Sequence, residues 1–140
     1  MPRALGIDLG SRRIGLALSD PTGTVASPHE VLVRSGDRGT DHRAIVAAAR
    51  AAGATRLVVG LPLSLSGEEG PAARAVRAEV EELREVAGAA LPVDLHDERL
   101  STVTAERTLV SAKMRRDARR RVVDKVAAAV MLQSYLETRR

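Results

Sequence analysis

The chain has 140 residues, a formal net charge of +4, 44% hydrophobic residues and 29% charged residues, which indicates one globular domain spanning residues 1–140 rather than a disordered chain. It contains no cysteine, so disulfides, iron–sulfur clusters and cysteine zinc sites are excluded. No apolar run reaches the ~20 residues of a membrane span or forms the core of a signal peptide, so a cytoplasmic protein without a membrane partner is expected.

Two segments near the N-terminus predict a β-hairpin. Large aliphatic residues alternate with Gly6, Asp8 and Gly10 in the first segment, and residues 14–19 repeat this pattern. Alternation with period two is typical of strands with one apolar face. Residues 20–23 (Asp-Pro-Thr-Gly) predict the turn after the second strand, and residues 30–33 predict a third strand that pairs with the second.

The rest of the chain predicts alternating strands and helices. Short apolar runs predict two further strands, and Pro92 suggests that the second of them lies near an edge; the ranges are 56–60 and 91–95. Amphipathic periodicity, glycine ends, a first-turn proline and Ser or Thr caps predict four helices; the ranges are 41–52, 71–87, 101–111 and about 120–137. The order predicts an α/β fold, a mixed five-stranded sheet with helices on both faces.

Two acidic positions stand out in the predicted strands. Asp8 lies in mid-strand, where aspartate is disfavoured, and its neighbours on the same face are glycines that leave room for a ligand or a polymer backbone. Asp94, Asp97 and Glu98 cluster at the carboxyl end of the fifth strand, the end where α/β sites gather. Asp94 and Asp97 are also readily explained as solvated or capping groups.

A third acid, Asp124, lies inside the last helix among alanine and valine residues. The alternative to a functional role is an ion pair with Arg120 or Arg121 on the helix surface. If Asp8, Glu98 and Asp124 converge, carboxylates ~4 Å apart would repel by ~4 kcal/mol at an effective dielectric of about 20, so the site would need a cation. Oxygen ligands without cysteine, and without a histidine pair at helical spacing, favour Mg²⁺ or Mn²⁺.

The C-terminal third of the chain is basic. Residues 99–140 carry 11 Lys and Arg against 4 Asp and Glu, whereas residues 1–98 carry 11 against 14. The run 113–121 has six basic residues and one acid; alone it is a solvated charge run, but beside a carboxylate–metal site it favours a clamp for a phosphate backbone. Tyr135 is the single aromatic residue, which disfavours recognition by base stacking.

Four motifs in this order resemble one family. They are GIDLGSRRIGLALSD (6–20), VVGLP with a downstream glycine (58–67), DERLST (97–102), and a basic stretch leading to VDKVAAAVMLQSYL (123–136). Together they resemble the bacterial YqgF/RuvX-like family, described as pre-16S rRNA nucleases or Holliday-junction-resolvase-like proteins of the ribonuclease H-like superfamily. The resemblance covers nearly the whole chain. It departs at Ser64 and Ser66-Gly67, where family members often carry Asn and an Asp-Gly pair.

The resemblance implies a ribonuclease H-like fold and a nuclease that hydrolyses phosphodiester bonds with Mg²⁺ or Mn²⁺. The family's catalytic and metal-binding acids fall on Asp8, Glu98 and Asp124. The implied partner is nucleic acid, either pre-16S rRNA or branched DNA, with ribosomal precursor particles and a homodimer as further expectations. The residues expected to hold the nucleic acid are Arg99, Lys113, Arg115, Arg116, Arg119, Arg120 and Arg121.

Three alternatives to an rRNA-maturing nuclease stay open. The first is a Holliday junction resolvase acting on branched DNA, and the second is a non-catalytic RNA- or ribosome-binding factor with the same basic surface. The third is a phosphotransferase or ATPase of the actin, Hsp70 or sugar-kinase type, because residues 6–10 look like the first phosphate loop of those proteins. Such enzymes close two lobes over a nucleotide, and 140 residues provide only one.

Overall fold

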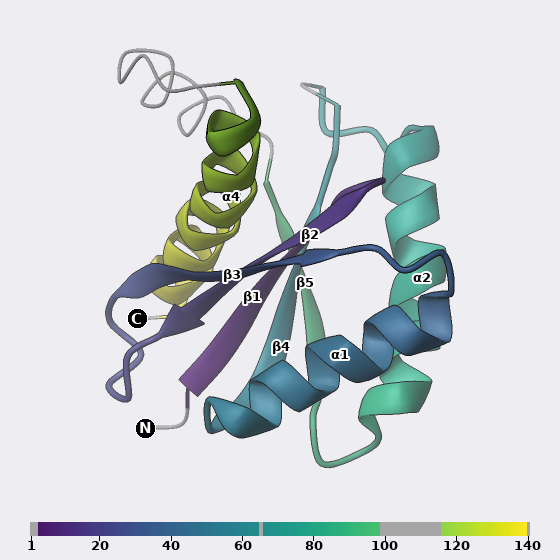
Figure 1. The fold of residues 1–140 in the computed structure, drawn as a ribbon. Helices are drawn as coiled ribbons and strands as arrows, with labels where there is room; N and C mark the ends of the chain where they lie inside the picture. The colour runs from purple at the N-terminus through teal and green to yellow at the C-terminus, as the bar shows by residue number, and fades with distance from the viewer. Residues whose placement is uncertain (1–2, 65, 99–115, 140) are drawn as a thin grey trace.

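A five-stranded sheet forms the centre of the computed structural model, which describes residues 3–64, 66–98 and 116–139 (Figure 1). The strand order is β3-β2-β1-β4-β5. β1, β2 and β3 pair antiparallel, whereas β4 pairs parallel with both β1 and β5, so the predicted mixed sheet is confirmed. The elements are β1 (Arg3–Leu9), β2 (Arg13–Ser19), β3 (Ala26–Val33), α1 (Arg38–Ala51), β4 (Ala54–Leu61), α2 (Pro71–Ala87), β5 (Val93–Asp97) and α4 (Arg116–Thr138).

The helices begin and end at residues suited to those positions. The Asp37 side chain caps α1 by accepting a 2.9 Å hydrogen bond from the Thr40 amide, and Pro71 occupies the first turn of α2, where its missing N–H is not needed. Gly88 ends α2 with a φ of 76° that other residues rarely adopt. Within the described residues, no helix is long and apolar enough to cross a membrane.

The two faces of the sheet carry side chains of different size. Large residues such as Leu5, Ile7 and Leu16 pack with apolar residues of α1 and α2 on one face. The other face is covered by α4 (Figure 1), and its central positions on β1 and β2 are small, as Gly6 and Ala17 illustrate. The alternation predicted from the sequence is therefore the division between the two covered faces of the sheet.

Glycine lets α4 lie against the strand backbones. A Cβ on Gly6 would lie 2.8 Å from the Cβ of Leu132, and a Cβ on Gly15 would lie 2.0 Å from the carbonyl oxygen of Asp124. Real Cβ atoms do not approach other atoms so closely, because a protein interior is packed at van der Waals distances. The position of α4, and of every side chain on its inner face, depends on these small residues.

Asp94 fastens the C-terminal part of α4 to the edge strand. Its carboxylate accepts a 2.5 Å hydrogen bond from the Tyr135 hydroxyl and pairs with Arg56 at 2.8 Å and Arg139 at 3.2 Å. Asp94 was expected at the carboxyl end of its strand, but β5 covers Val93–Asp97 and places Asp94 near the start. It is therefore neither a solvated group nor a cap.

Other boundaries also differ from those predicted, most of all the starts of the third strand and the last helix. The third strand begins at Ala26 and α4 at Arg116, because pairing with β2 and packing on the sheet extend elements that local sequence leaves undefined. The helix predicted over 101–111 lies outside the described residues.

Candidate active site

Asp8 lies on the face of the sheet that α4 covers. Its partner on β2 is Gly15, so no neighbouring side chain at that register position occupies the space beside the carboxyl. Burial, followed by repulsion from Asp124, raises the pKa of Asp8 to about 6. This carboxyl is thus costly to ionise in the absence of a cation.

Glu98 is the most buried acid of the site. It follows β5 directly, its amide donates a 3.2 Å hydrogen bond to the Leu61 carbonyl, and the residue is 8% exposed. A Cβ on Gly60 would lie 2.2 Å from Glu98 Oε2, so the VVGLP motif provides the room for this carboxyl. Burial, followed by repulsion from Asp8 and Asp97, raises the pKa of Glu98 to about 8.

One oxygen of Glu98 has no hydrogen-bond partner among the described residues. Oε2 is buried, and it accepts no hydrogen bond within the described part of the chain. Leaving a buried carboxylate oxygen unsatisfied costs on the order of 1–3 kcal/mol or more. Such an atom marks a place where a ligand or cation can bind.

Asp124 reaches the same region from α4. Its backbone lies against Gly15, and its Oδ2 accepts a 2.7 Å hydrogen bond from Nε of Arg13 on β2. The structure thus brings Asp8 close to both Asp124 and Glu98, because the charge of Asp124 raises the pKa of Asp8 and the charge of Asp8 raises the pKa of Glu98.

Arg13 is the residue that sequence reasoning missed. The alternative partners considered for Asp124 were Arg120 and Arg121, which are neighbours along the helix, whereas Arg13 is 111 positions away. The only available signal was the pair of arginines after Gly10, in a strand whose alternation places Arg13 on the same face as Gly15.

In the described ranges no three acidic or histidine side chains already form a metal-ligand set.

The donor chemistry fits a divalent metal. Three carboxylates from β1, the end of β5 and α4 offer the hard oxygen ligands that Mg²⁺ and Mn²⁺ prefer. The unsatisfied Glu98 oxygen and the raised pKa values of Asp8 and Glu98 are both features that a bound cation would relieve.

The raised pKa values predict how metal-free stability depends on pH. The folded protein binds protons on Asp8 and Glu98 more tightly than the unfolded chain, whose pKa values are 3.8 and 4.5. Stability from these groups is therefore complete below about pH 4 and is lost as pH rises through about 6 and then 8. We expect a loss on the order of a few kcal/mol across this range, measured by urea unfolding in EDTA; stability independent of pH would contradict it.

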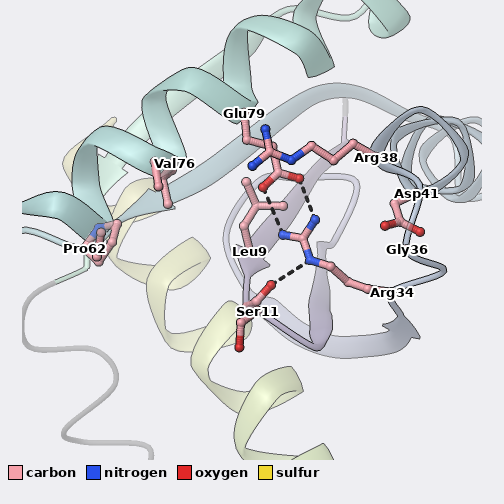
Figure 2. A pocket seen from close by; sticks show the side chains of 12 residues that line it. Leu9, Ser11, Arg34, Gly36, Arg38, Asp41, Pro62, Val76 and Glu79 are labelled. Carbon is pink, nitrogen blue, oxygen red and sulfur yellow. Dashed lines mark hydrogen bonds and ion pairs between the residues drawn. The ribbon is translucent and has the colours of Figure 1, made fainter.

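The turn between β1 and β2 is held from the opposite side of the sheet. Arg34 donates from Nε to the Gly10 carbonyl at 2.7 Å and forms two hydrogen bonds of 2.7 and 3.0 Å with Glu79, which also contacts the buried His42 at 2.8 Å. Figure 2 shows Arg34 between Glu79 and this turn. Arg34, Glu79 and Gly10 line a pocket with a volume of about 500 Å³. Because the guanidinium is already engaged, we assign it a structural role: it fixes the turn that follows Asp8.

All seven residues expected to bind nucleic acid lie outside the part of the chain whose side chains the structure describes. Arg99, Lys113 and Arg115 lie outside the described residues. Four others lie in the first part of α4, where the structure defines the helical backbone alone; they are Arg116, Arg119, Arg120 and Arg121. Their role stays a prediction.

The loop that departs from the family pattern forms a compact turn. Ser64 and Ser66 share a 2.9 Å hydroxyl hydrogen bond, and the Gly67 amide donates to the Ser64 carbonyl at 2.8 Å. The two serines therefore stabilise the turn through local hydrogen bonds.

Comparison with known proteins identifies relatives across the full chain. A family model described as "RuvX: Holliday junction resolvase" matches residues 2–138. A protein of Kineococcus radiotolerans is 49% identical over 137 residues, covering 97% of this chain and 72% of that protein. A protein of Roseiflexus sp. is 43% identical over 138 residues, covering 99% and 96%. Both are named "Putative pre-16S rRNA nuclease".

Two solved structures resemble the fold at low sequence identity. RuvC of T. thermophilus in complex with a Holliday junction substrate has a TM-score of 0.59 at 17% identity, covering 99% of this chain and 96% of that chain. The Fowlpox virus resolvase in complex with Holliday junction DNA has a TM-score of 0.55 at 10% identity, covering 97% of each chain. These likenesses confirm the ribonuclease H-like fold expected from the sequence.

Proposed function

The chain belongs to the RuvX family, and on that basis we propose that it is a divalent-metal-dependent nuclease that hydrolyses phosphodiester bonds in the 5′-end maturation of 16S rRNA. We further propose that it acts in the cytoplasm on ribosomal precursor particles. Its relatives named for pre-16S rRNA cleavage match nearly the whole chain, which favours RNA as the substrate.

The observation that carries the proposal is the buried Glu98 oxygen without a partner among the described residues, next to a second acid, Asp8, which is half-buried. A structural acid would be paired, as Asp94 is with Arg56 and Tyr135. Two neighbouring acids that are largely shielded from water and repel each other weaken the fold, so their presence favours a role in binding a cation.

Asp8, Glu98 and Asp124 are the residues that would hold Mg²⁺ or Mn²⁺. When bound, such ions supply Lewis-acid stabilisation of the attacking and leaving oxygens of a phosphodiester. Asp8 interacts electrostatically with both of the other acids: Asp124 raises its pKa, and Asp8 in turn raises the pKa of Glu98. We therefore assign Asp8 the role of the ligand shared by the ions. α4 and the sheet hold Asp124 and Asp8 on packed elements, which limits misalignment at the reacting phosphate.

The basic residues of the C-terminal third would bind the nucleic-acid backbone. Phosphate contacts by arginine and lysine give affinity and position without reading sequence. The residues proposed for this role are Arg99, Lys113, Arg115, Arg116, Arg119, Arg120 and Arg121.

A second candidate function is a Holliday junction resolvase, because the family description names this activity. Resolution of a junction needs two active sites that act symmetrically, so it would require a homodimer. Trimming of an RNA end needs a single site. Oligomeric state and substrate therefore have to be measured together.

The test incubates EDTA-treated protein with each of three nucleic acids, in the presence and in the absence of Mg²⁺ or Mn²⁺. We expect metal-dependent removal of the 5′ leader from a 16S precursor fragment, while a four-way DNA junction and a linear duplex of the same sequence stay intact. Light scattering on the same samples gives the mass. Symmetric cutting of the junction by a dimer would support the resolvase instead, and binding of RNA without cleavage under either metal would indicate a non-catalytic factor.

A further inference from the structure

Arg13 is tied to one of the acids of the proposed metal site. Its Nε donates to Asp124 Oδ2 at 2.7 Å, and the two side chains are 27% and 24% exposed. Among the described residues, no other ion pair involves Asp8, Glu98 or Asp124. The pair of Arg13 and Asp124 joins the first residue of β2 to α4 at the point where the helix lies on Gly15.

The position of Arg13 is fixed by its backbone. The Gly10 amide donates to the Arg13 carbonyl at 3.0 Å, and a Cβ on Gly10 would lie 2.4 Å from that carbonyl oxygen. Arg34, itself held by Glu79, binds the Gly10 carbonyl from the other side. The guanidinium therefore comes from a turn held by contacts on both sides, rather than from a freely moving loop.

The contact between Arg13 and Asp124 opposes the binding of a divalent cation to the Asp124 carboxylate. The guanidinium occupies a lone pair of Oδ2, and a cation bound to the same carboxylate would stand a few ångströms from a positive group in a partly buried setting. Like charges this close repel by on the order of several kcal/mol at an effective dielectric of about 20. This repulsion disfavours simultaneous binding of both cations to Asp124.

We propose that Arg13 is a positioning residue that takes the place of the metal at Asp124: it holds α4 on the sheet while the site lacks an ion, and it leaves Asp124 when an ion binds. This rests on the proposed function, because it presumes that the three acids hold a divalent metal. In the metal-free protein, the positive charge of Arg13 partly neutralises the three acids. Asp124 stays paired with Arg13 until the metal concentration is high enough for the ion to displace the guanidinium.

The first experiment measures metal affinity and stability in the same variants. For Arg13→Gln we expect the melting temperature in EDTA to fall by about 2–6 °C, because the ion pair is lost, while Mn²⁺ binds on the order of three- to tenfold more tightly by calorimetry, because no cation has to leave. Arg13→Lys, which keeps the charge, should stay near the wild type. Arg12→Gln removes the same charge from an exposed neighbouring position and should change neither quantity.

These outcomes separate the two proposals. Equal Mn²⁺ affinity of wild type and Arg13→Gln would overturn the role of Arg13 and leave the nuclease untouched. Equal tightening by Arg12→Gln would also overturn it, since net charge would then explain the effect. If the wild type binds neither Mn²⁺ nor Mg²⁺, the proposed metal-dependent function fails, and the role of Arg13 fails with it.

A second measurement uses the wild type, so it does not depend on a variant that folds. In ¹⁵N-labelled protein, the Nε–H signal of Arg13, identified by its disappearance in Arg13→Lys, should be protected from solvent exchange in EDTA. Saturating Mg²⁺ should shift this signal and remove its protection. A protected and unshifted Nε–H at saturating Mg²⁺ would mean that Arg13 and the ion share Asp124, which contradicts the proposal.

Discussion

Replacement of Asp8 by asparagine is expected to abolish metal-dependent cleavage while leaving the metal-free protein at least as stable as the wild type. Burial and the charge of Asp124 raise the pKa of Asp8 to about 6, so above that pH the ionised carboxylate costs folding free energy. Asparagine removes this charge at nearly constant volume. Without the shared carboxylate, the cleavage rate should fall about a thousandfold or more.

The measurement pairs single-turnover cleavage in Mg²⁺ with thermal unfolding in EDTA. Asp94→Asn is the matched control, because Asp94 also faces α4 but belongs to the ion-paired cluster at its C-terminal end. Burial opposes ionisation there, yet the hydrogen bond from Tyr135 and the charge of Arg56 lower the pKa of Asp94 overall. Asp94→Asn should therefore destabilise the protein and leave the cleavage rate unchanged. A clear loss of metal-free stability in Asp8→Asn would mean that Asp8 is structural.

Replacement of Gly15 by alanine is the second change with a large expected effect. The new Cβ would lie 2.0 Å from the Asp124 carbonyl oxygen and 2.6 Å from its carbon. Both are backbone atoms of α4, which no side-chain rotation can move aside, so the helix has to shift by about 1 Å or more to reach a normal contact distance. The shift moves Asp124 relative to Asp8, and a displacement of this size costs on the order of 100-fold in rate.

Alanine at position 15 should also lower stability by about 1–3 kcal/mol, the usual cost of overpacking. Urea unfolding and cleavage assays on the same protein measure both effects. Gly70→Ala is the control, because a Cβ there meets nothing within 4 Å and the φ of −84° suits any residue. A Gly15→Ala variant with wild-type cleavage would show that α4 can retreat without moving the reacting groups.

The small residues of the N-terminal hairpin could be recognised from the sequence, but the sequence did not show that they make room for a helix. Alternation of large residues with Gly6, Asp8 and Gly15 correctly predicted two strands and a face cleared of bulk. That the cleared face accommodates a helix, which lies against Gly15 and presents Asp124, follows from contacts between segments more than a hundred residues apart. Period-two patterns describe a strand and say nothing about what covers it.

The region around β5 shows where local patterns were too weak. The apolar run and Pro92 predicted a strand near an edge, and this is confirmed. The strand covers Val93–Asp97, however, and so begins and ends two residues later than the predicted range 91–95. The pairing of Leu57 with Val93, rather than the local sequence, sets the start of β5. That shift places Asp94 in the cluster with Tyr135 and leaves Glu98 directly after the strand end.

The sequence by itself determined the fold class, the strand order of the hairpin and the three acids worth proposing, because periodicity, turn residues and misplaced charges are local properties. Only the tertiary structure decided which charges meet: Asp8 beside Asp124 and Glu98, Arg13 on Asp124, and Arg34 on Glu79. Electrostatic pairing depends on distance in space and on burial, and neither quantity exists until the chain is folded.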